Sequence, residues 1–183
     1  FDNSISDDIF GKIVAIIRIA APYTGMIIST RESEESRRKV LELGVSQLSG
    51  GSCTSVGGYS NVADNTDHSA QFDISDTRTL DEIVRWLLEL GHIPSFCTAC
   101  YRQGRTGDRF MALVKSGKIA DCCGPNALMT LKEYLEDYAS EGTLKEGLRL
   151  IDEELGSIPN EKIRLLTVRN LKSISEGKRD FRF

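Results

Sequence analysis

Apolar residues recur with a helical period along much of the chain, which predicts a protein rich in helices. The spacing indicates helices at residues 9–20, 34–43, 79–90, 108–116, 125–139, 144–155 and 161–175. Apolar side chains cover most of the circumference of the first helix, so we expect that helix to be well buried. Pro125 is typical of a first helical turn, and Ser33 is a suitable N-cap for the second helix.

Short apolar runs between the first helices predict strands. We expect strands at residues 24–30 and 45–49 and a brief one at 72–74. The first two lie about twenty residues apart with a helix between them, which is the repeat of parallel α/β architecture. Residues 50–69 are rich in Gly and Ser and long for a simple connection, so we interpret them as functional or mobile.

Composition bounds the class of protein. The chain has 183 residues, 40% of them hydrophobic, which suits one compact domain or a small domain with an extension. Its net charge is −4 and its basic residues are dispersed, which argues against nucleic acid as a partner. Arg18 interrupts the longest apolar stretch, and the amino end lacks a signal-peptide pattern, so we expect no membrane partner. The chain begins with Phe1 rather than Met, so we expect it to be part of a longer protein.

The cysteines carry the strongest chemical signal. There are five, and an odd number does not favour a disulfide framework, so we expect reduced thiols and a cytoplasmic location. Cys97 and Cys100 form a C-x2-C pair, and the adjacent Cys122 and Cys123 follow about two dozen residues later. This pattern predicts a metal or iron–sulfur site, with Cys53 interpreted as incidental.

The number of ligands follows from the adjacency of the last two cysteines. Side chains of adjacent residues diverge, so only one of Cys122 and Cys123 is expected to join Cys97 and Cys100. A cubane cluster with three thiolates leaves one iron open to another ligand. The alternative is a zinc site that only stabilises the fold, although a closed zinc site favours a second spaced pair.

Basic residues and glycines surround the C-x2-C pair. Arg102, Arg105 and Arg109 are expected to form the environment of the cluster, because positive charge lowers thiol pKa values and stabilises an anionic cluster. Gly104 and Gly107 would let backbone N–H groups approach the sulfur atoms. Ordinary surface charge is the alternative interpretation of the three arginines.

Polar residues follow the two main predicted strands. Arg31 follows the first of these strands, and Gln47 and Ser49 belong to the second. In a β/α barrel the carboxyl ends of the strands are where active sites lie, so these polar residues are candidates for a site. The alternative is that Arg31 and Glu32 belong to a solvated cap of the next helix.

Several of these motifs together resemble a known family. The matching segments include the strand regions, the cysteine segment and the last residues, namely 22–32, 44–49, 57–59, 97–107, 125–128 and 177–180. They resemble the carboxyl half of the FeFe-hydrogenase maturation tyrosine lyases. These are radical S-adenosylmethionine (SAM) enzymes related to the thiazole-forming tyrosine lyase and to biotin synthase. The resemblance covers essentially the whole chain, and the cysteine segment is its most specific part.

The resemblance implies an α/β fold in two parts. Residues 1–70 would be the last βα units of a TIM-type (β/α) barrel, and residues 71–183 a mainly helical domain with an auxiliary 4Fe–4S cluster. The family binds this cluster through C-x2-C and a third cysteine after twenty-two residues. That spacing selects Cys97, Cys100 and Cys123 as metal ligands and makes Cys122 a bystander.

The resemblance also implies a reaction. In the family, a SAM radical cleaves tyrosine to p-cresol and dehydroglycine, and dehydroglycine becomes carbon monoxide and cyanide at the auxiliary cluster. These ligands bind an extra iron and pass to other hydrogenase maturation proteins. By this resemblance Arg31 is a candidate to bind the carboxylate of the amino-acid substrate with two hydrogen bonds, and Gln47 and Ser49 on the neighbouring strand are candidates to complete the substrate-binding site. The C-x3-C-x2-C motif of the SAM cluster is absent from this sequence, so we expect the radical to need a missing amino-terminal half. A structural module, an interaction domain that binds a partner maturase and a thiazole-pathway relative are the alternatives.

Overall fold

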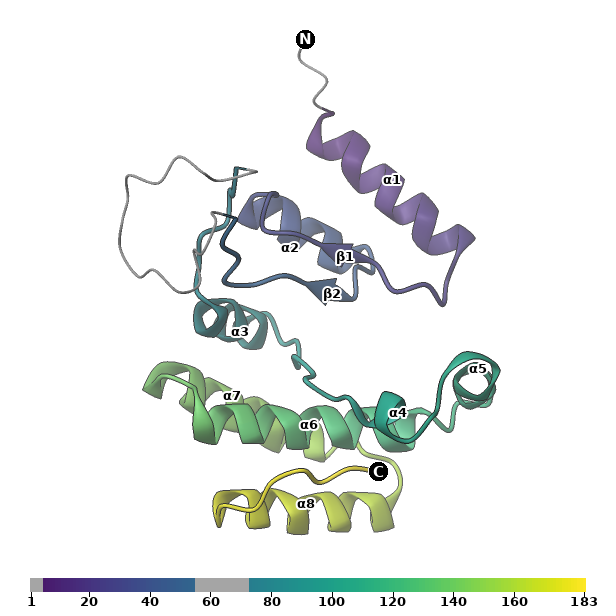
Figure 1. The fold of residues 1–183 in the computed structure, drawn as a ribbon, viewed down its shortest axis with the longest axis vertical. Coiled ribbons are helices and arrows are strands. Elements are labelled where there is room, and N and C mark those ends of the chain that lie inside the picture. Colours follow the sequence, from purple (N-terminus) through teal and green to yellow (C-terminus); the bar gives the residue numbers. More distant parts are fainter. Residues whose placement is uncertain (1–4, 55–72) are drawn as a thin grey trace. The chain divides into compact units, whose positions relative to one another are not determined.

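A computed structural model describes residues 5–54 and 73–183 and divides into two compact units, Phe1–Leu80 and Asp81–Phe183 (Figure 1). The elements are α1 (Asp7–Ala20), β1 (Ile27–Ile28), α2 (Glu34–Glu42), β2 (Gln47–Leu48), α3 (Leu80–Glu89), α4 (Ala99–Arg102), α5 (Gly107–Lys115), α6 (Ala120–Asp137), α7 (Glu141–Leu155) and α8 (Glu161–Ser175). The mainly helical character expected from the sequence is confirmed. The expected boundary at residue 70 lies outside the described residues and stays a prediction.

The first unit contains one parallel pair of strands joined by a helix. Ile27 pairs with Gln47 and Ile28 with Leu48, so β1 and β2 run in the same direction on either side of α2. Ser33 caps α2 as expected, accepting a hydrogen bond from the Ser36 N–H. The small core consists of Val14, Ile28, Val40 and Val45.

The expected barrel units are not found. Each strand has two residues, and the described residues contain no third strand. A TIM barrel needs eight parallel strands whose two faces are both covered. In the first unit only one side of β1 is covered, since Ile28 is buried whereas Ile27 is 67% exposed. The sequence pattern therefore identified a local strand–helix–strand unit correctly, whereas the barrel units that the resemblance implied are wrong for this chain.

Helix α1 departs from the expected burial. Val14 is its only buried residue, whereas five of its isoleucines are exposed: Ile9, Ile13, Ile16, Ile17 and Ile19. An apolar circumference does not bury a helix when neighbouring elements reach only one of its sides. Arg18, which interrupts the apolar run, has a structural role. Its guanidinium donates hydrogen bonds to the carbonyl oxygens of Pro22, Thr24 and Gly44.

A buried ion pair links the strand ends of the first unit. Arg37, fully buried on α2, binds the carboxylate of Asp76 and the carbonyl oxygen of Ser49. Arg78 binds the same carboxylate with Nε–Oδ1 and Nη2–Oδ2 distances of 2.9 and 2.7 Å. Two hydrogen bonds to the Thr30 carbonyl oxygen hold residues 75 and 76 beside the end of β1. The first unit is therefore stabilised by charged residues as well as by its four-residue apolar core.

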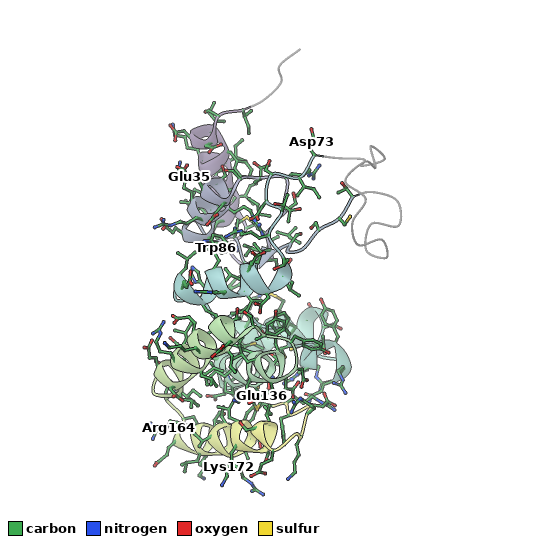
Figure 2. All side chains as sticks on the ribbon, turned by 90° about the vertical axis from the view of Figure 1, so that its left-hand side faces the viewer. Glu35, Asp73, Trp86, Glu136, Arg164 and Lys172 are labelled. Carbon is green, nitrogen blue, oxygen red and sulfur yellow. The ribbon has the colours of Figure 1, made fainter. Side chains whose placement is uncertain are left out.

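The second unit is a helical bundle around α6. Its core joins Leu128, Leu131 and Leu135 of α6 to apolar residues of α3, α7, α8 and the α7–α8 turn: Val84, Leu88, Leu150, Ile151, Ile158, Leu171 and Ile174. The exposed side of α8 is mixed: Figure 2 shows Lys172 pointing away from the bundle, and Leu165, Leu166 and Val168 are also exposed. No helix in the described part of the chain is long and apolar enough to span a membrane.

Three element boundaries differ from the sequence-based expectation. Helix α6 begins at Ala120, so Pro125 lies inside the helix rather than in its first turn, and Cys122 and Cys123 are helical. The short helix α4 lies at the C-x2-C motif, where the apolar pattern predicted no helix. Residues 73 and 74 are not in a strand, and Phe72 lies outside the described residues.

The buried ion pair makes the stability of the first unit depend on acidity. Hydrogen bonds from Arg78 lower the pKa of Asp76 to about 2, against the effect of burial and with help from the charge of Arg37. The charged Asp76 carboxylate therefore stabilises the folded state by about 2 kcal/mol. This stabilisation is fully present above the pKa of Asp76 in the unfolded chain, ~4, and is lost as the pH falls to ~2.

Replacing Asp76→Asn should cost about 3 kcal/mol at neutral pH, because it leaves the Arg37 charge buried without its carboxylate. Urea unfolding between neutral and acidic pH checks this, with wild type and variant converging on acidification. Glu35→Gln is the matched control, because Glu35 forms an exposed ion pair with Lys39. Parallel pH profiles for wild type and Asp76→Asn would contradict the expectation.

Candidate metal centre

Three cysteines line one cavity in the second unit. The cavity has a volume of about 380 Å³, and Cys97, Cys100 and Cys123 contribute to its wall. Arg105 is also part of the wall, together with apolar surface from Tyr101 and Phe110. The structure therefore brings together the three residues that the family spacing selects.

The segment before the C-x2-C motif is anchored on α6. Ile93 packs against the core of the second unit. The Phe96 N–H donates a hydrogen bond of 3.2 Å to Thr130 Oγ1, and the Phe96 ring stacks on Tyr134 at a centroid distance of 5.0 Å. Cys97 follows at once, and its Sγ accepts a hydrogen bond from the Ala99 N–H at 3.4 Å. An N–H donor of this kind stabilises a thiolate.

Helix α6 separates the two adjacent cysteines. Successive residues in an α-helix point about 100° apart, because one turn takes about 3.6 residues. Cys123 lines the cavity, whereas the Cys122 Sγ lies 3.7 Å from Nη1 of Arg105. The divergence expected from adjacency is therefore present, and it gives the two thiols different surroundings.

The turn after α4 carries the basic residue that lies nearest to the thiols. The Arg105 N–H donates to the Cys100 carbonyl oxygen at 2.8 Å, which closes the turn. Its guanidinium donates from Nη2 to the Phe183 main-chain oxygen at 2.7 Å. Arg105 Nε is buried and has no hydrogen-bond partner among the described residues. Arg105 thus joins the turn to Phe183 and has one buried N–H donor without an acceptor.

The other two arginines do not line the cavity. Arg102 forms an ion pair with Asp180, with a distance of 2.8 Å between Nη2 and Oδ2. Arg109 is exposed on α5. Gly104 and Gly107 have φ angles of +62° and +54°, and an added Cβ would meet open space at both. A left-handed backbone, rather than close approach to sulfur, explains these glycines.

The thiols influence one another electrostatically. Desolvation raises the pKa of Cys123, and the neighbouring Cys100, Cys97 and Cys122 raise it further, with Arg105 acting in the opposite direction. Within residues 5–54 and 73–183, no three His, Cys, Asp or Glu side chains are already arranged as a metal-binding group. The sulfur atoms therefore share one cavity without converging on one point.

The donors nevertheless fit an iron–sulfur group. Thiolates are its usual protein ligands, and N–H groups directed at sulfur are its usual surroundings. Three thiols line one cavity, and Arg105, which has a buried N–H without an acceptor, is part of the same wall.

The remaining candidates belong to the first unit. Cys53 lies there and is not among the residues that line the thiol cavity. Arg31 is exposed after β1, and its Nε lies 3.3 Å from Ser29 Oγ. Ser49 follows β2, and its carbonyl oxygen binds Arg37. The Gln47 amide lies beside Gly25, before β1, so the structure does not bring it to the strand end where Arg31 lies.

The sequence analysis assigned no role to two residues near the thiols, although both lie in segments that carry the family resemblance. Asn126 is 2% exposed, and its Oδ1 accepts a hydrogen bond of 2.9 Å from the Phe183 N–H. Asp180 binds Arg102. A polar residue at an apolar position of a helix was the available signal for Asn126, whereas no local pattern relates Asp180 to the cysteines.

The shared cavity predicts which thiols can be cross-linked. In the metal-free, reduced chain, dibromobimane should join a peptide containing Cys97 and Cys100 to one containing Cys122 and Cys123, because thiols from both segments are neighbours. Peptide mapping by mass spectrometry checks the link. Cys53→Ser should leave it unchanged. Links confined to cysteines of the same segment would contradict the geometry.

Comparisons with known proteins identify the family. The Biotin and Thiamin Synthesis associated domain (BATS) matches residues 1–93. The crystal structure of HydG, a maturase of the FeFe-hydrogenase, is 50% identical with a TM-score of 0.92, and the match covers 100% of this chain and 39% of that one. HydG from Carboxydothermus hydrogenoformans, a FeFe-hydrogenase maturase, is 39% identical with a TM-score of 0.67, covering 93% of this chain and 35% of that one.

No curated protein matches the chain. The chain spans less than two fifths of the length of either solved maturase. The resemblance to the hydrogenase-maturation family, expected from the motifs, is confirmed by both structures, over the whole chain in the first and over 93% of it in the second. The chain belongs to the family of the Biotin and Thiamin Synthesis associated domain, and its similarity to the HydG maturases extends through the cysteine segment.

Proposed function

We propose that this chain is the part of a hydrogenase-maturation radical SAM enzyme that holds an auxiliary 4Fe–4S cluster. The observation that carries the proposal is the common cavity of Cys97, Cys100 and Cys123 in a chain half identical to a hydrogenase maturase. The three thiols line one mainly apolar pocket, and Arg105 contributes to its wall.

The chemistry of the donors favours an iron–sulfur cluster over structural zinc. Structural zinc normally takes four ligands in a closed tetrahedral site. The fourth sulfur in this region, that of Cys122, contacts Arg105 instead of lining the cavity. When bound by three thiolates, a 4Fe–4S cluster supplies one iron that is open to a non-protein ligand. Arg105 would offer its unpartnered Nε–H as a hydrogen-bond donor at this wall.

The proposed reaction belongs to the longer protein. It is the cleavage of tyrosine to p-cresol and dehydroglycine, followed by formation of carbon monoxide and cyanide for the active site of FeFe-hydrogenase. The SAM cluster would lie in a segment outside this chain, since the C-x3-C-x2-C motif is absent here. Other hydrogenase maturation proteins are the proposed recipients of the products.

The surface of α1 supports the presence of a further segment. Ile16 and Ile19 are 65% and 81% exposed, and three more isoleucines of the same helix are at least 41% exposed. An apolar face of this size normally marks an interaction surface. The amino-terminal half of the same protein is the proposed partner of this face, because the related maturases are more than twice as long as this chain.

The cluster assignment predicts a selective effect of two neighbouring cysteines. After anaerobic reconstitution with iron and sulfide, the wild-type chain should bind about four irons, the content of one such cluster, and absorb broadly in the visible range. Cys123→Ser should lose most of this iron, whereas Cys122→Ser should retain it. Iron and sulfide analysis with absorption and EPR spectra provides the measurement.

Cys53→Ser is the control for nonspecific loss of a thiol, because Cys53 lies in the other unit. Stoichiometric zinc with no bound iron would support the structural module instead. Equal iron loss in Cys122→Ser and Cys123→Ser would contradict the assignment of Cys123.

Substrate binding is proposed for Arg31, with Ser49 as a second candidate; Gln47 is left out because its amide lies beside Gly25, away from that strand end. Replacing Arg31→Ala in the complete enzyme should raise the Michaelis constant for tyrosine by about tenfold or more, since a charge-assisted bond to the carboxylate contributes about 1.5 to 3 kcal/mol. The measurement is p-cresol formation at varied tyrosine concentration. Arg38→Ala, an exposed arginine on α2, is the control. An unchanged Michaelis constant would exclude the role.

A further inference from the structure

The residues after α8 form a segment that returns along α6. Residues 177–183, here called the tail segment, contain no helix or strand, and Figure 1 shows this segment turning back beside α8. Gly177 makes the reversal with a φ of +92°. Arg179 then binds both carboxylate oxygens of Asp137 on α6, at 2.9 and 2.6 Å. This bidentate ion pair therefore holds the start of the tail segment against α6.

Asp180 has an unfavourable backbone conformation that its contacts maintain. Its φ is +71°, and it is the only non-glycine residue with positive φ in the described part of the chain. Its N–H donates a 2.6 Å hydrogen bond to Glu133 of α6. Its carboxylate binds Arg102, two residues after Cys100, and Arg182. The strained residue therefore links α6 to the C-x2-C helix.

The main chain of Phe183 lies between two residues next to the thiols. Its N–H donates to Oδ1 of the buried Asn126, three residues after Cys123. Its oxygen accepts from Nη2 of Arg105, five residues after Cys100. The tail segment thus contacts both elements that carry the cysteine ligands.

Apart from the contacts of the tail segment, helices α4 and α5 make few packing contacts. Helix α5 has no buried residue, and Ala99 is the only buried residue of α4. The main helix packing of the unit is that of α6 with α7 and α8, in which neither α4 nor α5 takes a comparable part. Polar contacts from the tail segment are therefore a large share of what holds the C-x2-C turn near Cys123.

We propose that the tail segment is a clamp that fixes the α4 turn against α6 and positions Arg105 at the thiol cavity. This inference rests on the proposed cluster function and extends it. Arg105 would act as a positioning residue, with Nη2 anchored on Phe183, Nη1 near Cys122 and Nε–H free to donate to a group in the cavity. The ion pair between Asp180 and Arg102 would hold the turn after α4 in place against α6.

The clamp can be tested without metal by hydrogen exchange. In the reduced, metal-free 183-residue chain, Arg102→Gln and Asp180→Asn should each speed amide exchange in residues 99–107, because each removes the link between tail segment and turn. Arg149→Gln is the matched control, since Arg149 forms exposed ion pairs on α7. Thermal unfolding monitored by circular dichroism tests whether the bundle stays folded. Unchanged exchange at residues 99–107 in both variants would overturn the clamp.

The role of Arg105 is tested in the reconstituted chain. Arg105→Gln should shift the EPR spectrum of the reduced cluster, lower its midpoint potential and speed iron release to a chelator by about tenfold, a usual loss for residues that support metal ligands. Arg105→Lys should restore the potential more than the release rate, since it keeps the charge but not the planar donors.

Wild-type values of potential and release rate in Arg105→Gln would overturn the positioning role. Failure of the wild-type chain to bind any cluster would contradict the proposed function instead. The exchange experiment still decides the clamp in that case.

Discussion

The packing of α6 against α7 and α8 is the interaction on which the candidate site depends. It buries Leu128, Leu131 and Leu135 and so fixes the orientation of a helix whose first turns carry Cys123 and Asn126. At Gly147 the approach of α7 to α6 leaves no space for a side chain, since an added Cβ would lie 2.5 Å from Leu135 Cδ1. Such close packing resists displacement, because every shift costs contacts or creates overlap.

The thiol cavity combines this rigid element with a poorly packed one. Cys123 comes from the bundle, whereas Cys97 and Cys100 come from an extended segment and a four-residue helix. Stacking of Phe96 on Tyr134 and the ion pair of Arg102 with Asp180 compensate for the lack of apolar packing. With this combination the three thiols share one cavity but do not converge on one point. A bound group would supply the remaining constraint.

Charged residues hold both units where apolar contacts are few. In the first unit, Arg37 and Asp76 are buried together and join α2 to the ends of the two strands. In the second, Arg179 and Asp137 attach the tail segment to α6 at the surface. Breaking a buried ion pair destabilises a protein more than breaking an exposed one. The buried pair leaves an unpaired charge inside the protein, whereas a charge from an exposed pair is solvated.

Local patterns in the sequence determined the longer helices, though not the start of α6, as well as the parallel strand–helix–strand unit and the C-x2-C motif with a third thiol downstream. These features follow from periodicity, caps and spacing, which act over a few residues. Tertiary structure alone decided that α1 exposes its isoleucines, that two-residue strands do not form barrel units, and that Arg105 rather than Arg102 or Arg109 lines the cavity. It also brought Asp180 and Phe183 to residues 78 positions earlier in the chain. Burial and long-range hydrogen bonds depend on which distant surfaces meet, and no local pattern of residues encodes that.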